Sequence, residues 1–127
     1  MYIIMVNHGD RGLFYIEPDT ISPSELNDWL TNLEGKIETQ MGRKLTTIII
    51  NGSCYSGSFI PALSKENRII ITSATSEERS VQGPRTQGKT YGEYFNYYLF
   101  SYLSKGETLL EAFKNAAKIT QLYFKES

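Results

Sequence analysis

Cys54 and His8 are the only cysteine and the only histidine in the chain, and each stands at the end of an apolar run. The run 46–50 leads to the cysteine, and the run 2–6 leads to the histidine. A thiol and an imidazole are the minimum parts for covalent nucleophilic catalysis, in which the imidazole takes the thiol proton and later protonates the leaving group. Because parallel strands end at the same edge of a sheet, we expect the two side chains to lie on neighbouring strands and to face one cleft.

Gly9 follows the histidine directly and adds a candidate hydrogen-bond donor to the site. Without a side chain, its N–H could approach a substrate carbonyl, and together with the N–H of Cys54 it would form an oxyanion hole. The alternative interpretation is that the cysteine is a small core residue and that His8 and Gly9 form a turn. The position of both motifs at strand ends favours the catalytic interpretation. Asp10 could orient the imidazole, although aspartate beside glycine also favours a turn.

The elements between the two motifs are predicted to form a strand–helix–strand unit. Residues 2–7 are continuously apolar, as in a strand that is buried on both faces. Ser22 and Glu25 predict a capping box at the start of a helix, and Gly42 predicts its end. The chain then enters a second strand at 46–51, which completes the crossover.

The rest of the chain continues the alternation of strands and helices. The pattern predicts a short helix at 57–64, a strand at 68–73 and a long polar loop at 74–89. A second capping box at 90–93 and a final helix at 107–124 follow. We therefore predict a single α/β domain over residues 1–127, a three-layer sandwich with a small, mainly parallel sheet and helices on both faces. Trp29 is expected in its core.

Composition narrows the possible partners. The chain has 127 residues and a formal net charge of -1, without a basic run, so we expect no nucleic-acid partner. No stretch is long and apolar enough to span a membrane, and no signal peptide opens the chain, so we expect no membrane partner. The compartment stays open, with the cytoplasm favoured, because a signal could precede this segment. A single cysteine excludes an intrachain disulfide and a zinc site with several cysteines, and we expect neither metal nor cofactor.

At these residues the chain resembles the legumain-like cysteine peptidases, peptidase family C13, of the caspase-like clan CD. The matching features are an apolar strand into His8-Gly9, a capped helix, and an apolar strand into Ser53-Cys54 that is followed by Ser56-Gly57-Ser58. The next strand, which runs into Thr72-Ser73-Ala74, also resembles the family pattern. The resemblance covers roughly residues 2–104. The Gln-Ala-Cys signature of caspases is absent.

The resemblance implies a caspase-like fold and a cysteine-type endopeptidase that acts on a peptide or protein substrate. It implies a catalytic dyad of His8 and Cys54, an oxyanion hole that uses Gly9, and an acyl-enzyme intermediate. In legumain an acidic residue of the specificity pocket stands at the place of Gly52, so a preference for asparagine is not carried over. The residues that we expect to line the substrate pocket are Gly52, Ser53, Ser73, Glu77 and Glu78. The two glutamates would suit a basic side chain.

Two other functions remain open on the same residues. One is a catalytically inactive, caspase-like interaction or scaffold module, and the other is a peptide ligase or transpeptidase. Folds of this kind normally begin with a strand and a helix upstream of the histidine strand, whereas here that strand starts by residue 2. We therefore expect either a homodimer formed through a sheet edge or helix face, or a longer parent chain that supplies the missing strands.

Overall fold

The structure is a computed structural model that describes residues 1–90 and 92–126. The chain contains two compact units, Met1–Arg79 and Ser80–Ser127. The first unit holds a small parallel sheet with helices, which confirms the predicted α/β class. No helix within the described residues is long and apolar enough to cross a membrane.

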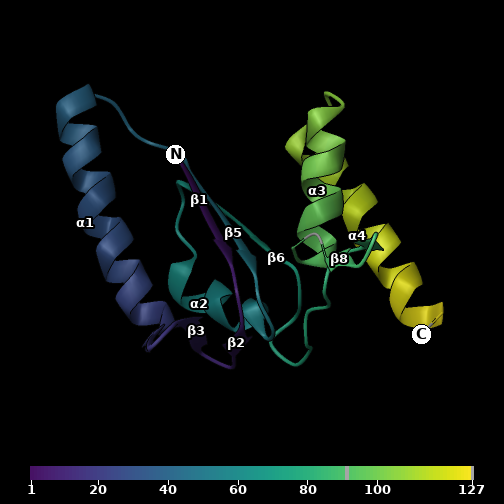
Figure 1. Ribbon diagram of the computed structural model, residues 1–127. Coiled ribbons are helices and arrows are strands. Elements are labelled where there is room, and N and C mark those ends of the chain that lie inside the picture. The colour runs from purple at the N-terminus through teal and green to yellow at the C-terminus, as the bar shows by residue number, and fades with distance from the viewer. Residues whose placement is uncertain (91, 127) are drawn as a thin grey trace. The chain divides into compact units, whose positions relative to one another are not determined.

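The main sheet of the first unit consists of three parallel strands. They are β1 (Tyr2–Val6), β5 (Thr47–Gly52) and β6 (Arg68–Thr72), in the order β1-β5-β6 (Figure 1). All three were predicted, because continuously apolar runs are typical of strands in parallel sheets. Parallel order places their carboxyl ends at one edge of the sheet.

A second, antiparallel sheet follows β1. It consists of β2 (Gly9–Asp10), β3 (Leu13–Ile16) and β4 (Asp19–Ile21), in that order. The β2–β3 hairpin starts directly after His8, so it fixes the path of the chain on the far side of the histidine.

The crossover helix α1 (Pro23–Met41) begins and ends as predicted. The Glu25 N–H donates to Ser22 Oγ at 3.2 Å, and the Ser22 N–H donates to Glu25 Oε2 at 2.8 Å, which is a complete capping box. Gly42 closes the helix in the left-handed conformation, with φ 66°.

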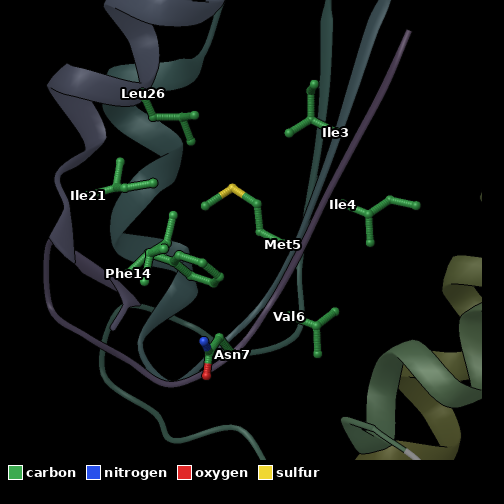
Figure 2. Close-up of a pocket in the computed structure, with 9 residues that line it drawn as sticks. Ile3, Ile4, Met5, Val6, Asn7, Phe14, Ile21 and Leu26 are labelled. Carbon is green, nitrogen blue, oxygen red and sulfur yellow. The ribbon is translucent and has the colours of Figure 1, made fainter. Parts of the chain in front are cut away.

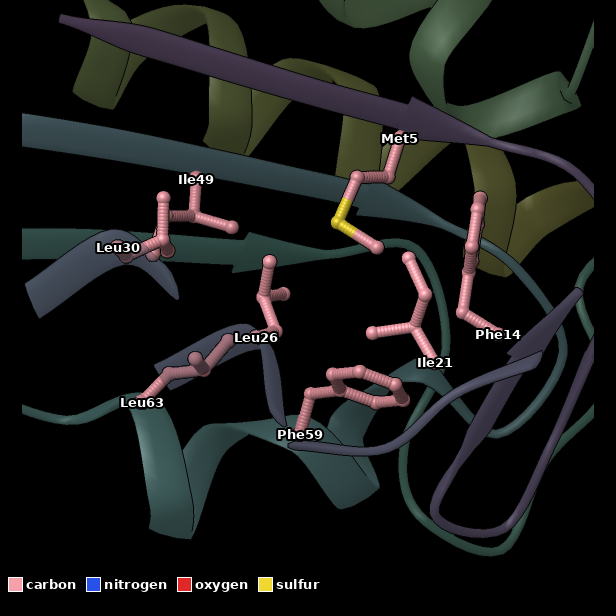
Figure 3. Close-up of a cluster of buried hydrophobic side chains, with 8 residues drawn as sticks. All are labelled: Met5, Phe14, Ile21, Leu26, Leu30, Ile49, Phe59 and Leu63. Carbon is pink, nitrogen blue, oxygen red and sulfur yellow. The ribbon is translucent and has the colours of Figure 1, made fainter. Parts of the chain in front are cut away.

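The core of the first unit lies between the parallel sheet and its helices. After β5 the chain forms the 3-10 helix η1 (Ser56–Phe59) and the short helix α2 (Ile60–Leu63), close to the predicted range. Figure 3 shows the side chains of the strands pointing toward those of the helices. The buried cluster consists of Met5, Phe14, Ile21, Leu26, Leu30, Ile49, Phe59 and Leu63.

Trp29 does not belong to this core, so the predicted position was wrong. Its side chain is 55% exposed, whereas Leu26 and Leu30 are buried. These two leucines stand one helical turn apart and occupy the stripe of α1 that faces the sheet. Trp29 lies beside that stripe rather than within it.

A buried ion pair ties α1 to the beginning of the strands. The Arg68 side chain is fully buried and forms a salt bridge with Glu34. Its Nη1 also donates to Asn27 Oδ1 at 2.8 Å and to the Leu63 carbonyl at 3.0 Å. Burial, the largest single influence, favours protonation of Glu34, but hydrogen bonds from Arg68 and Thr47 and the charges of Arg68 and Lys65 outweigh it and lower the Glu34 pKa.

An open apolar groove runs along the outer side of β1. It has a volume of about 360 Å³. Figure 2 shows Phe14, Ile21 and Leu26 facing β1 on one side, while Ile4 and Val6 point away on the other. The groove is lined by Ile3, Ile4, Met5, Val6, Asn7, Phe14, Ile16, Ile21 and Leu26.

The second unit begins with a short hairpin inside the predicted loop, β7 (Arg85–Thr86) and β8 (Lys89–Thr90). Helix α3 (Tyr94–Ser104) follows. The predicted capping box at 90–93 was wrong, because Glu93 is itself the N-cap and its carboxylate accepts from two N–H groups of the first turn. Gly92, with φ 62°, prevents an earlier helix start. Tyr91, which belongs to the predicted box, lies outside the described residues.

Helix α4 (Leu109–Glu126) completes the second unit and packs against α3. The rings of Phe95 and Phe113 meet edge to face with centroids 5.9 Å apart. Thr108 and Glu111 form a reciprocal capping box, with the Glu111 N–H donating to Thr108 Oγ1 at 3.2 Å and the Thr108 N–H donating to Glu111 Oε2 at 3.0 Å. The helix therefore begins slightly after the predicted residue 107.

Candidate active site

The candidate site lies at the edge where β1 and β5 end. The two strands are parallel neighbours, and Val6 pairs in register with Gly52. His8 and Cys54 each follow two residues after that pair, so both leave the sheet at the same edge. The neighbouring parallel strands expected from the sequence are therefore present.

Gly9 brings the two segments into direct contact. A Cβ atom at this position would lie 2.8 Å from Ser53 Oγ and 2.9 Å from the Cys54 carbonyl oxygen. Real Cβ atoms do not approach other atoms so closely, so any larger residue would force a shift. The missing side chain thus allows the histidine turn to pack on Ser53 and Cys54.

The backbone of His8 is held on both sides by the β2–β3 hairpin. The His8 N–H donates to Asn7 Oδ1 at 2.8 Å, and the His8 carbonyl accepts from the Tyr15 N–H at 3.1 Å. Asn7 Nδ2 in turn donates to the Tyr15 carbonyl at 3.1 Å. The residue is exposed, and its imidazole makes no hydrogen bond or ion pair within the described residues. A fixed backbone with an accessible ring suits proton transfer.

The residue after the cysteine, Tyr55, has a left-handed backbone with φ 56° and ψ 24°. Residues other than glycine rarely adopt this conformation, and such strain concentrates at functional sites. The Tyr55 N–H donates to the Glu78 carbonyl at 2.7 Å, and its carbonyl accepts from Ser58 Oγ at 2.6 Å. The turn after Cys54 is therefore tied to the loop that follows β6.

Further contacts hold that loop against the same turn. The Gly57 N–H donates to the Ala74 carbonyl at 3.0 Å, and the Ala74 N–H donates to Ser56 Oγ at 3.2 Å. A Cβ atom at Gly57 would lie only 2.7 Å from the Ser76 nitrogen. The close packing brings the loop residues predicted for the substrate pocket to the edge that carries Cys54.

Buried polar groups lie beneath the cysteine. Ser53 Oγ donates to Asn51 Oδ1 at 2.8 Å, and the Ser73 N–H donates to the Asn51 carbonyl at 3.1 Å. Asn51 Nδ2 and Ser73 Oγ are buried without a hydrogen-bond partner among the described residues. Such atoms are uncommon in folded proteins and call for a specific explanation. Asn51 was not predicted, although a polar residue at the end of an apolar strand was an available signal.

The two predicted acidic pocket residues already have partners. Glu77 forms a salt bridge with Arg11, whose guanidinium carbon lies 5.6 Å from the centroid of the Tyr55 ring. Glu78 Oε2 accepts from the Thr75 N–H at 3.4 Å. Their expected role in a pocket for basic side chains stays a prediction.

Arg79 was also absent from the predicted site. A hydrogen bond from its guanidinium to the Tyr55 side chain, and then the charge of that side chain, raise the pKa of Arg79. Cys54 and, more weakly, Asp10 act in the same direction. The backbone bond between Tyr55 and Glu78 brings the loop that carries Arg79 to this turn. A contact between two distant loop segments leaves no pattern in the sequence.

The groups at this edge fit acyl transfer. They offer a thiol, an imidazole and backbone N–H groups, which are the parts of a nucleophile, a base and an oxyanion hole. In the described ranges no group of three or more His, Cys, Asp and Glu side chains could hold a metal ion.

A comparison with protein families decides the assignment. The model of the peptidase C13 family matches residues 1–126, nearly the whole chain. The chain belongs to the peptidase C13 family. No curated protein matches it. Membership in the peptidase C13 family confirms the resemblance seen in the sequence, implies a caspase-like fold and indicates cysteine peptidase activity.

Proposed function

We propose that this chain is a cysteine endopeptidase in which Cys54 is the nucleophile and His8 is the general base and acid. The observation that carries the proposal is the contact of Gly9 with Ser53 and Cys54, because it joins the histidine turn to the cysteine turn at one edge of the sheet. Family membership supports the reaction class. The Gly9 and Cys54 N–H groups are the proposed oxyanion donors.

The proposed reaction proceeds in two steps. The His8 imidazole takes the thiol proton, and the Cys54 sulfur attacks the carbonyl carbon of the scissile peptide bond. The tetrahedral oxyanion collapses, the C–N bond breaks, and the imidazolium gives its proton to the leaving amine. Water, deprotonated by the same imidazole, then attacks the thioester and releases the acid product and the thiol.

The test uses alkylation of Cys54 by iodoacetamide at neutral pH, followed by mass spectrometry. General-base assistance is worth about 100-fold in favourable cases, so His8→Ala should slow labelling clearly. Lys36→Ala, on the exposed face of α1, is the control and should label like the wild type. Cys54→Ala should abolish peptide hydrolysis and keep the fold. Equal labelling rates in wild type and His8→Ala would identify an ordinary exposed thiol and refute the dyad.

Two further measurements separate this proposal from its alternatives. A thiol-reactive peptide probe should label Cys54 in an enzyme and leave a scaffold module unlabelled. Product analysis with an added amine should yield the free acid from a hydrolase and the amide from a ligase. Amide as the main product would replace hydrolysis by transpeptidation on the same two residues.

A further inference from the structure

Two buried polar side chains lie at the end of β5, in contact with Gly9. Asn51 follows three isoleucines of β5, and Ser53 comes directly before Cys54; each of the two is 1% exposed. Ser53 Oγ donates to Asn51 Oδ1 at 2.8 Å. We call Asn51 and Ser53 the buried polar pair. Because an apolar residue could fill such a position without a desolvation cost, the pair calls for a reason beyond core packing.

The contact of this pair with Gly9 depends on where the serine hydroxyl points. A Cβ atom at Gly9 would lie 2.8 Å from Ser53 Oγ and 2.9 Å from Ser53 Cβ, so the glycine backbone rests directly on this side chain. A serine side chain can occupy several staggered rotamers, and each puts Oγ in a different place. The bond to Asn51 selects one of them. One hydrogen bond and one packing contact therefore link Asn51 to the residue that follows His8.

Asn51 itself is anchored in the middle of the parallel sheet. β5 is the central strand, and Asn51 pairs with Met5 of β1 on one side and with Thr72 of β6 on the other. The Asn51 carbonyl accepts from the Ser73 N–H at 3.1 Å. The acceptor that holds Ser53 therefore stands on a strand that is paired on both sides, and the pair carries the position of this strand to the histidine turn.

The amide of Asn51 is used at its oxygen and not at its nitrogen. Oδ1 accepts from Ser53, whereas Nδ2 is buried without a partner among the described residues. A fully bonded amide would stabilise the end of the strand, but an unpaired buried donor offsets that gain. The side-chain interaction that remains is the one that orients Ser53 beneath Gly9.

We propose that Asn51 is a positioning residue: it acts through Ser53 to set the distance between the histidine turn and Cys54. The role in the reaction rests on the proposed peptidase function. A misplacement of about 1 Å between reacting groups can cost on the order of 100-fold in rate, so a fixed spacing between the two turns has catalytic value. The alternative is that the pair only stabilises the end of the strand.

The two roles differ in what happens to the influence of His8 on Cys54. A positioning role requires that loss of Asn51 weakens the assistance that His8 gives to the thiol. A stabilising role lowers the free energy of unfolding but leaves that assistance intact in every folded molecule. A double-mutant cycle measures the difference, because it isolates the coupling of two residues.

The cycle uses alkylation of Cys54 by iodoacetamide at neutral pH, in which the sulfur forms a bond to carbon, iodide leaves and His8 takes the thiol proton. The rate is measured with and without His8→Ala, in the wild-type and in the Asn51→Leu background, on chains that circular dichroism shows to be folded. We expect the slowing caused by His8→Ala to be smaller by about threefold or more in Asn51→Leu. Ser53→Ala should weaken the effect of His8 in the same way, and it carries the test if Asn51→Leu does not fold.

Ser56→Ala is the matched control. Ser56 is also a buried serine and stands two residues after Cys54, but its hydroxyl bonds to the carbonyl and the N–H of Ala74, on the loop after β6. The slowing by His8→Ala should keep its full size in this variant. An unchanged His8 effect in Asn51→Leu, or an equal loss of that effect in Ser56→Ala, overturns the proposal.

The outcomes separate this proposal from the peptidase function on which it rests. A His8→Ala variant that labels like the wild type refutes the dyad and the positioning role together. A His8 effect of full size in both backgrounds keeps the dyad and refutes the positioning role alone. Coupling between Asn51 and His8 without turnover of any peptide supports the positioning role and removes the peptidase function. Where peptides are turned over, a fall in kcat in Asn51→Leu supports the proposal, and a change in KM alone overturns it.

Discussion

At the scale of single residues, Gly9 has one of the two most restricted glycine positions in the candidate site, with Gly57 as the other. A Cβ atom added at Gly9 would face Ser53 and the Cys54 carbonyl at distances that real side chains do not show. The contact is with backbone as well as with a side chain, so it cannot be relieved by a rotamer change. The identity of this residue therefore bears on packing and on the proposed oxyanion hole at once.

Gly9→Ala should separate these residue-scale effects from the general cost of an added methyl group. Displacement of the turn removes one oxyanion donor, so kcat for peptide hydrolysis should fall on the order of 100-fold or more. Overpacking should lower the free energy of unfolding by about 1–3 kcal/mol. Kinetics with a peptide substrate and urea unfolding measure the two effects.

Gly35→Ala is the matched control. Nothing lies within 4 Å of a Cβ atom at Gly35, which stands inside α1. The change should leave activity intact and stabilise the helix by up to about 1 kcal/mol. If Gly9→Ala behaves like Gly35→Ala, the turn at Gly9 is not part of the site.

The sequence allowed prediction of the residues whose position depends on strand ends. His8, Gly9 and Cys54 follow apolar runs, and parallel strands end at a common edge. It did not allow prediction of the contact between the turn after Cys54 and the loop at Glu78. That contact depends on a left-handed residue, Tyr55, and on one backbone hydrogen bond between distant segments, which leave no periodic signal.

At the scale of elements, the ion pair of Glu34 and Arg68 fixes α1 against β6. The pKa of Glu34 is lower in the folded state, so the folded protein binds the carboxyl proton of Glu34 less tightly than the unfolded chain does. Its contribution to stability is therefore complete above the unfolded pKa and is lost as the pH falls through the folded pKa.

Glu34→Gln should lower the free energy of unfolding by about 3 kcal/mol at neutral pH, because it leaves a buried guanidinium without a counter-charge. The difference from the wild type should shrink in acid, where wild-type Glu34 becomes protonated. Urea unfolding at several pH values measures this. Glu66→Gln, an exposed carboxylate near the same strand, is the control and should stay within about 0.5 kcal/mol. A loss that does not depend on pH contradicts the assigned linkage.

The helix starts show which elements local sequence determines. The Ser22 and Glu25 pair predicted the first turn of α1, because both side chains act within four residues of each other. The same spacing at 90–93 misled the prediction of α3. There Gly92 adopts a left-handed conformation, and Glu93 takes the N-cap position instead.

At the scale of the whole molecule, the outer edge of β1 is the most exposed apolar feature of the sheet. The Ile48 N–H donates to the Met1 carbonyl at 2.8 Å, so alternate residues of β1 direct their backbone groups away from β5. These are Tyr2, Ile4 and Val6, whose residues are 57%, 52% and 45% exposed. Unpaired backbone groups with apolar side chains form a template for another strand.

We expect this edge to mediate self-association of the purified chain. Light scattering at rising concentration should show a dimer, and Ile4→Lys should shift it to monomer because a lysine blocks strand pairing. Leu110→Lys is the control, since Leu110 is 62% exposed on α4. A monomer at all concentrations, with full turnover of a peptide substrate, would show that the edge needs no partner.

The ion pair and the candidate site lie at opposite ends of the same strands, so the effect of acid on the ion pair can be followed at a distance from the reactive groups. Thr47 and Arg68 begin β5 and β6 beside Glu34, while the reactive groups follow the other ends, about 17 Å away for five residues of strand. Protonation of Glu34 should loosen α1, which carries the single tryptophan, Trp29. Tryptophan fluorescence, followed in acid beside the alkylation of Cys54, would thus show whether a change at the ion pair reaches the far ends of the strands.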